Sequence, residues 1–237
     1  MDLFFHPELE ETTKHLKFEG EEFHHITRVM RYLTGQEFSV TNGKGLIANA
    51  KLLEISKSNC VCEVIEIKSF PKRKENLIAL VPILKNLERF EFAIEKLTEL
   101  GVNEIVPYYS ERSVKKNFRF ERSQKILISA IKQSFNPYLP ELRELTLFDK
   151  YFENVNQNDL ILYGNPEGKT LVQLMNSIDL SISQNIIITV GPEGDFTEKE
   201  IEILKSKNGI AVNLGNNRLR SETAIISLLV QLRMFMI

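Results

Sequence analysis

Two glycine-centred turns, each placed between a β-branched apolar run and a helical pattern, constrain the fold of this chain more than any other feature. The first turn is Gly191-Pro192-Glu193-Gly194 after the apolar run 186–190, and the second begins at Leu214-Gly215 after the run 210–214. A strand that passes through a glycine turn into a helix is the building unit of parallel α/β sheets. Two such units in succession predict a ligand site at the carboxyl ends of neighbouring strands.

The same alternation of strands and helices begins further upstream. Strands are predicted at 77–83, 104–107 and 159–163, and helices at 86–100, 120–134 and 171–178. Gly101 is the expected stop of the helix 86–100, and Thr197 with Glu200 predicts a capping box at the start of the next-to-last helix. Ser221 is the expected cap of the last helix. The sequence therefore predicts an α/β fold with a mostly parallel sheet covered by helices.

Residues 1–70 have a different pattern. Short alternating runs at 37–40, 46–53 and 59–67, with Asn42-Gly43 as a turn signal, predict a small β-barrel or sandwich. A helical pattern over 21–33 would place Arg28 and Arg31 on one face, either as an ion-pair site or as a ligand contact. The charged, Pro-containing stretch 70–75 is the expected linker, so we predict domains at 1–70 and 71–237.

Charge is distributed unevenly along a chain whose formal net charge is only −2. Residues 71–150 carry a net +4, whereas the segments before and after them each carry −3. The basic excess is concentrated between Arg112 and Lys125, and such runs are either a solvated face or a nucleic-acid contact.

Several classes of protein are excluded by simple counts. The longest apolar runs are too short to cross a bilayer, and the N-terminus lacks the basic region of a signal peptide, so we expect a cytoplasmic protein without a membrane partner. Cys60 and Cys62 lie two apart in a predicted strand, hence on one strand face, which suits neither a disulfide nor a metal motif. We expect no metal.

The glycine turns do not resemble a phosphate cradle. They contain neither a P-loop Lys-Ser/Thr pair nor G-x-G-x-x-G, which argues against a Rossmann nucleotide enzyme. Pro192 removes a donor from the first turn, and acids lie nearby, so a neutral or cationic ligand fits better than a pyrophosphate. A purely structural turn is the alternative.

An ordered set of motifs along nearly the whole chain resembles the RsmE family of small-subunit ribosomal RNA uridine-N3 methyltransferases, within the SPOUT superfamily. The motifs are His25 with Val29-Met30-Arg31 and Gly35; Lys85; Lys96-Leu97-Thr98-Glu99-Leu100-Gly101-Val102 and Pro107; Ser110-Glu111-Arg112-Ser113; Gln133-Ser134 and Pro140; Gly191-Pro192-Glu193-Gly194; and Leu214-Gly215, Arg218-Leu219-Arg220 and Glu222-Thr223-Ala224. The last two are the most diagnostic. Asp195 departs from the family, which commonly has a second glycine there.

The resemblance implies a C-terminal SPOUT-type domain tied in a trefoil knot, an N-terminal PUA-like β-barrel that grips RNA, and a homodimer with the last helix near the interface. It implies S-adenosylmethionine as cofactor and small-subunit ribosomal RNA, in the assembled subunit, as partner. The cofactor would contact three turns, at Tyr163, Gly164, Asn165, Gly191, Pro192, Glu193, Gly194, Leu214, Gly215, Arg218, Leu219, Ser221 and Thr223.

Roles in methyl transfer follow from position and charge. A cation near the uridine would stabilise the anion that forms when the imide proton leaves, and we assign this role to Arg220; its alternative role is to pair with Glu222 or Glu193. Glu193 and Glu222 are also candidate bases, and neither is chosen. RNA contacts are expected at Arg28, Arg31, Arg112, Lys115, Lys116 and Arg119. The rival functions are a SPOUT methyltransferase for another RNA and a non-catalytic RNA-binding assembly factor.

Overall fold

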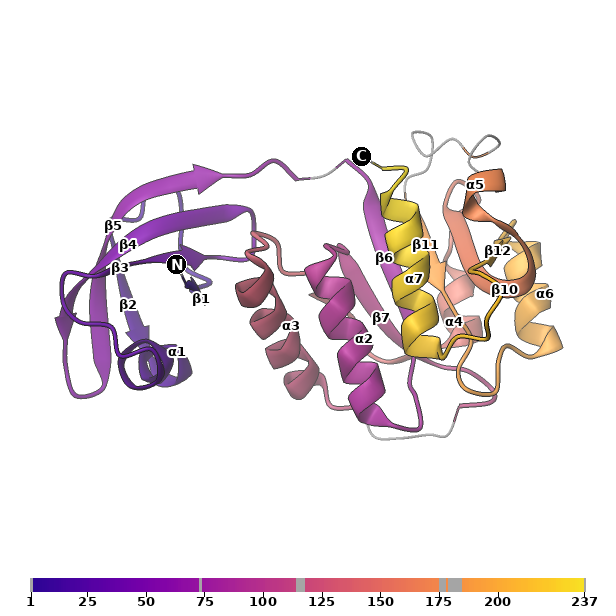
Figure 1. Ribbon diagram of the computed structural model, residues 1–237, viewed down its shortest axis with the longest axis horizontal. Helices are drawn as coiled ribbons and strands as arrows, with labels where there is room; N and C mark the ends of the chain where they lie inside the picture. Colours follow the sequence, from indigo (N-terminus) through magenta and orange to yellow (C-terminus); the bar gives the residue numbers. More distant parts are fainter. Residues whose placement is uncertain (1, 73, 114–117, 175–177, 179–184, 237) are drawn as a thin grey trace. The chain divides into compact units, whose positions relative to one another are not determined.

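The structure is a computed structural model that describes residues 2–72, 74–113, 118–174, 178 and 185–236 (Figure 1). The chain forms two compact units. The first comprises Met1–Lys72 together with Ile128–Leu139, and the second comprises Arg73–Leu127 and Pro140–Ile237. The return of 128–139 to the first unit had no signal in the sequence.

The first unit is built on a five-stranded sheet in the order β1-β3-β4-β5-β2. Its strands are β1 (Leu3–Phe5), β2 (His15–Glu19), β3 (Glu37–Thr41), β4 (Leu46–Ile55) and β5 (Asn59–Ser69). β1 pairs with β3 in parallel, and the other pairs are antiparallel. The predicted strands at 37–40, 46–53 and 59–67 are confirmed, whereas β1 and β2 were missed.

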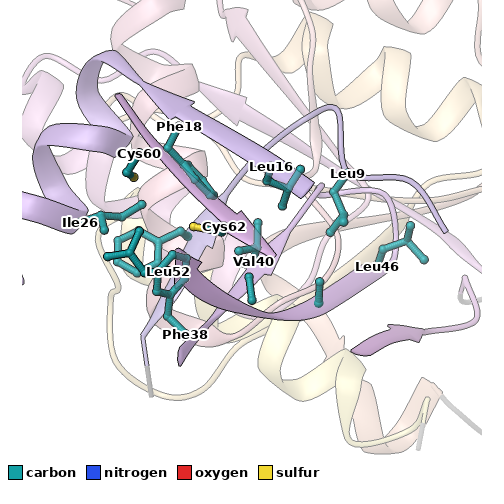
Figure 2. Close-up of a cluster of buried hydrophobic side chains, with 13 residues drawn as sticks. Leu9, Leu16, Phe18, Ile26, Phe38, Val40, Leu46, Leu52, Cys60 and Cys62 are labelled. Carbon is teal, nitrogen blue, oxygen red and sulfur yellow. The ribbon is translucent and has the colours of Figure 1, made fainter. Parts of the chain in front are cut away.

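One apolar cluster fills this unit (Figure 2). Phe18, Phe38 and Leu52 from three strands meet there, and each is at most 1% exposed. Cys60 and Cys62 point into the same cluster and are both free thiols, as their spacing on one strand face predicted. They act as small apolar side chains in this core.

The helical segment of the first unit is shorter and tighter than the pattern predicted. It consists of α1 (Gly20–His24) and one π-helical turn, η1 (His25–Val29). Arg31 adopts φ 56°, in the left-handed region, so the helix has ended before it. The expectation that Arg28 and Arg31 share a helical face is therefore wrong.

The segment 128–139 is attached to the first unit by main-chain and side-chain contacts. Leu139 N donates to Gly43 O at 2.8 Å, and Gly45 N donates to Pro137 O at 2.9 Å. The Lys132 ammonium lies 2.5 Å from Glu22 Oε1, and the Lys132 side chain is 12% exposed. This mostly buried ion pair acts together with the two main-chain hydrogen bonds to fix the position of the segment against α1.

The second unit contains the predicted parallel sheet. Its strand order is β12-β10-β11-β6-β7-β8, with β9 pairing to β7, and among the described residues each of these strand pairs is parallel. The strands are β6 (Asn76–Pro82), β7 (Glu104–Tyr109), β8 (Glu141–Leu142), β9 (Thr146–Leu147), β10 (Leu160–Thr170), β11 (Asn185–Thr189) and β12 (Ile210–Asn213). The α/β fold with a mostly parallel sheet is confirmed.

Helices cover this sheet. They are α2 (Leu87–Glu99), α3 (Phe120–Ser134), α4 (Phe148–Glu153), α5 (Leu171–Leu174), α6 (Glu198–Ser206) and α7 (Ser221–Arg233), with α3 ending in the first unit. α2 and α7 run side by side and pack on the central strands (Figure 1). Ile78 and Leu80 face a separate core with Phe148 and Leu204, from α4 and α6. Because alternate strand residues point to opposite sides, the sheet is covered on both faces.

Local sequence signals predicted some helix ends correctly and others wrongly. Gly101 has φ 77° after α2, and Thr197 and Glu200 form the predicted capping box of α6. The prediction that Ser221 caps α7 is wrong: Arg220 is the extended N-cap residue, with ψ 156°, and Ser221 is already helical. The predicted helix 171–178 is described only at α5, and β8, β9 and α4 were missed.

The described part of the chain contains no helix long and apolar enough to cross a membrane. Within the same residues, no cluster of three or more His, Cys, Asp or Glu side chains is arranged to hold a metal ion.

Candidate functional site

A cavity of ≈ 780 Å³ lies in the second unit, beside an irregular stretch within β10 and at the carboxyl ends of β11 and β12. Three chain segments form most of its wall: residues 164–166 within β10, where the pairing with β12 is interrupted, and the turns that follow β11 and β12. Arg89 of α2 also lines it. Its lining residues are Arg89, Gly164, Asn165, Pro166, Val190, Gly191, Pro192, Glu193, Asp195, Asn213, Leu214, Gly215, Asn216, Asn217, Arg218, Leu219, Arg220, Ser221 and Ala224. The volume is that of a small-molecule site, at the place where open parallel sheets bind ligands.

The turn after β11 is held from outside by residues of and after β7. The Tyr108 phenol donates to Val190 O at 2.7 Å, and burial raises the pKa of Tyr108 well above its usual value, so it remains a donor. Arg112 Nη1 donates to Gly194 O at 2.7 Å. Because both ends of the turn are fixed, its backbone conformation is set before any ligand binds.

The backbone of the cavity wall requires glycine at one position and leaves little space for a side chain at another. A Cβ on Gly191 would lie 2.7 Å from Phe196 N, a main-chain atom of the same turn. A Cβ on Gly164 would lie 3.0 Å from Val190 Cγ1 and 3.3 Å from Leu214 Cδ1. Gly164 therefore lets the three turns approach one another closely.

Asp195 occupies a left-handed conformation, with φ 62°. This explains physically why a glycine would suit that position. Its carboxylate Oδ1 accepts from Phe196 N at 2.8 Å, a local bond of the kind that lets Asp tolerate this conformation. Asp195 therefore fits the backbone conformation of this turn.

The acids near the cavity have partners other than Arg220. Glu193 Oε1 accepts from Lys85 N at 2.8 Å, and Glu222 Oε1 lies 3.7 Å from Arg89 Nε. Among the residues that the structure describes, Arg220 forms no ion pair or side-chain hydrogen bond. The alternative prediction, that Arg220 pairs with Glu222 or Glu193, is therefore wrong for the described residues.

Most predicted cofactor contacts come together in this one cavity. The lining includes Gly164, Asn165, Gly191, Pro192, Glu193, Leu214, Gly215, Arg218, Leu219 and Ser221, with Arg220. Three predicted residues are not part of the lining. Tyr163 is 2% exposed and packs against Phe196, Gly194 lies beneath Arg112, and Thr223 is exposed on α7.

The predicted RNA contacts are more scattered. Arg112 is used to hold the turn after β11, as described above, whereas Arg28, Arg31 and Arg119 are exposed and form no ion pair with any described residue. Lys115 and Lys116 lie outside the described residues.

Sequence reasoning missed several lining residues, of which Arg89 has the most distinctive chemistry. It lies in the first turn of α2, far in sequence from the glycine turns. Asn213 was also missed; its amide donates to Pro166 O at 2.8 Å and joins two of the walls. Neither position has a signal in a single sequence, because each acts through contacts between distant segments.

Comparison with known protein families shows the class of protein to which this chain belongs. Residues 71–233 match the RNA methyltransferase domain family, and residues 18–65 match the RNA methyltransferase PUA domain. The chain is thus an RNA methyltransferase with an N-terminal PUA-type domain.

Individual relatives narrow the class. Ribosomal RNA small subunit methyltransferase E of Aquifex aeolicus is 30% identical over 89% of this chain and 90% of its own. The protein of the same name from Bacillus subtilis is 29% identical over 86% and 84%. A crystal structure of the Neisseria gonorrhoeae enzyme of that name, bound to S-adenosyl methionine, superposes with a TM-score of 0.89 at 25% identity and covers 99% of this chain and 98% of its own. The chain belongs to the ribosomal RNA small subunit methyltransferase E family, RsmE.

Proposed function

We propose that this protein transfers a methyl group from S-adenosylmethionine to N3 of a specific uridine in small-subunit (16S) ribosomal RNA. The observation that carries the proposal is the cavity formed by residues 164–166 of β10 and by the turns after β11 and β12. Relatives aligned over most of the chain are named for methylation of this RNA, and one of them was solved with this cofactor.

The residues present fit the cofactor. Its adenosine would lie against the backbone of the glycine turns, whose close packing depends on Gly164 and Gly191. Its sulfonium is cationic, and Glu193 and Asp195 supply negative charge at the wall. When bound, S-adenosylmethionine supplies the methyl group for an in-line displacement.

The protein's part in the reaction is alignment and charge stabilisation. Arg220 lines the cavity with a guanidinium free of described partners, so it can donate to a uridine carbonyl oxygen as negative charge develops there. Glu193 is engaged by Lys85 N and Glu222 is paired with Arg89, which makes both poor general bases in this state. Loss of the imide proton to solvent is compatible with the arrangement.

The partners follow from the same family. We propose that Arg28, Arg31 and Arg119, with Lys115 and Lys116, contact RNA phosphates, and that the substrate is the assembled small subunit. We also propose a homodimer formed near α7, whose Val230 is 42% exposed and is followed by Met234, which is 71% exposed. The trefoil knot and a cytoplasmic location belong to the same proposal.

Titration of the purified protein with S-adenosylmethionine tests the cofactor assignment. Saturable binding that Gly191→Ala abolishes is expected, because the new Cβ would displace the turn after β11. A protein that binds RNA but no S-adenosylmethionine would be the non-catalytic assembly factor. Methylation of transfer RNA in place of ribosomal RNA would keep the enzyme class and change the substrate.

A further inference from the structure

Arg89 lines the cavity from α2, on the wall that the glycine turns do not form. Its side chain is 36% exposed, and its ion-pair partner among the described residues is Glu222, with Arg89 Nε 3.7 Å from Glu222 Oε1. That distance is too long for a hydrogen bond. A guanidinium has five N–H donors in a planar fork, and none of them donates to a described residue.

This is unusual for an arginine of the second unit that lies beside a carboxylate. Arg143 Nε donates to Glu104 Oε1 at 3.0 Å, and Arg122 Nη2 donates to Glu91 Oε2 at 2.7 Å. Those two pairs use their donors within the protein. Arg89 is held near Glu222 but keeps its donors available at the cavity surface.

The charges around the cavity favour an anionic group near Arg89. Arg218 and Arg220 also line it and form no ion pair with a described residue. The carboxylates of Glu193 and Asp195 already accept from Lys85 N and Phe196 N. The lining therefore carries three guanidinium groups, of Arg89, Arg218 and Arg220, that donate no side-chain hydrogen bond to a described residue.

The backbone of a helix also contributes to the electrostatic potential in the cavity. Arg89 lies in the first turn of α2, and Ser221 and Ala224 place the first turn of α7 at the same cavity. The N-cap residue of α7 provides no side-chain hydrogen bond. The amino end of α7, a helix of 13 residues packed against α2, thus adds positive potential near Arg89.

We propose, on the basis of the function above, that Arg89 binds the anionic oxygens of a ligand in this cavity. The chemistry is bidentate recognition of a planar carboxylate or of a phosphate by a guanidinium. Two sources can supply it: the carboxylate of the methionine part of S-adenosylmethionine, or a backbone phosphate beside the target uridine.

The cofactor arm of the test compares S-adenosylmethionine with decarboxylated S-adenosylmethionine by calorimetry. If Arg89 binds the carboxylate, Arg89→Ala weakens binding of S-adenosylmethionine by ~10- to 100-fold, the range for a lost charged hydrogen bond. Binding of the decarboxylated compound changes less than about 2-fold, which is within the additivity error of unconnected groups. Arg89→Lys restores part of the preference, because it keeps the charge and loses the fork.

The RNA arm measures KM for small ribosomal subunits that lack the modification, at several salt concentrations. If Arg89 binds a phosphate, Arg89→Ala raises KM and lowers the salt slope by about 0.7 to 0.9, the amount expected for one lost phosphate contact. Affinities for the two cofactors then stay equal to those of the wild type.

Glu222→Gln is the matched control, because it breaks the same ion pair and keeps Arg89. Equal loss of affinity for both cofactors in Arg89→Ala, reproduced by Glu222→Gln, would mean that Arg89 only braces α7 and would overturn the assignment. No change in either arm would also overturn it. A wild-type protein that binds neither cofactor would refute the proposed function itself, a result that no Arg89 variant can imitate.

Discussion

Arg220 combines an extended N-cap backbone with a side chain that lines the cavity and has no described ion-pair partner. Its charge is therefore available to a substrate, because no ion pair with a described residue neutralises it. Arg220→Ala should lower kcat for methyl transfer by ~100-fold or more, the usual loss when a donor to a developing anion is removed. The affinity for S-adenosylmethionine, measured by calorimetry, should stay within a few-fold of the wild type.

Turnover that survives Arg220→Ala would contradict the catalytic role. Arg218→Ala is the control, since Arg218 lines the same cavity and precedes the N-cap position by two residues. We expect that variant to alter cofactor affinity more than kcat.

Asp195 gives a second prediction at the residue scale. Asp195→Ala and Asp195→Gly both remove the carboxylate that accepts from Phe196 N, so the difference between them reports the left-handed backbone alone. The glycine variant should be more stable than the alanine variant by ~1 kcal/mol, measured by urea unfolding. Equal stabilities would mean that the turn changes conformation when the carboxylate is lost.

The turn after β11 depends on contacts from β7 and the loop that follows it. Arg112→Ala removes the bond to Gly194 O and should weaken S-adenosylmethionine binding by ~10-fold, which corresponds to ~1.4 kcal/mol. The salt dependence of RNA binding should be unchanged, because the guanidinium already faces the turn.

Arg119→Ala is the matched control for Arg112→Ala. Arg119 is exposed and has no described ion pair, so its loss should reduce RNA affinity and the salt slope while cofactor binding stays constant. If both variants gave the same pattern, the distinction between the two arginines would be wrong.

Elements with local signals could be predicted from the sequence, and those fixed by distant contacts could not. Thr197 and Glu200 cap α6 within one helical turn, so the capping box could be predicted from the sequence. β10 was expected to end at 163 because Gly164-Asn165-Pro166 follows, yet Lys169 and Thr170 pair again with Val212 and Asn213 of β12. That pairing joins segments more than 40 residues apart, and no local pattern encodes it.

The candidate site shows the same division. The glycine turns were found because each carries its own strand-turn-helix signal, and the structure brings them to one cavity. Arg89 reaches the cavity through the packing of α2 on α7, which depends on two apolar helix faces meeting. A single sequence reveals each face but not their pairing.

At the scale of the whole molecule, residues far apart in sequence hold the first unit together. Lys132 and Glu22 are mostly buried and 110 positions apart. Lys132→Met alone leaves the Glu22 carboxylate without this partner and should destabilise the first unit by ~3 kcal/mol in urea unfolding. The double variant with Glu22→Gln should recover much of that loss, because no unpaired charge remains.

If the double variant were no more stable than Lys132→Met, the loss would come from packing and not from the unpaired charge. The Lys132 ammonium also lies 5.6 Å from the Phe4 ring centroid, so some loss should persist in both variants.

The central claim is that this protein methylates N3 of a uridine in small-subunit ribosomal RNA. Its most direct test is transfer of a labelled methyl group from S-adenosylmethionine to small ribosomal subunits that lack the modification. The RNA is then digested and the labelled nucleoside is identified by mass spectrometry and chromatography. We predict that the label is found in 3-methyluridine; label in another nucleoside, or no label in subunits or in transfer RNA, would contradict the account.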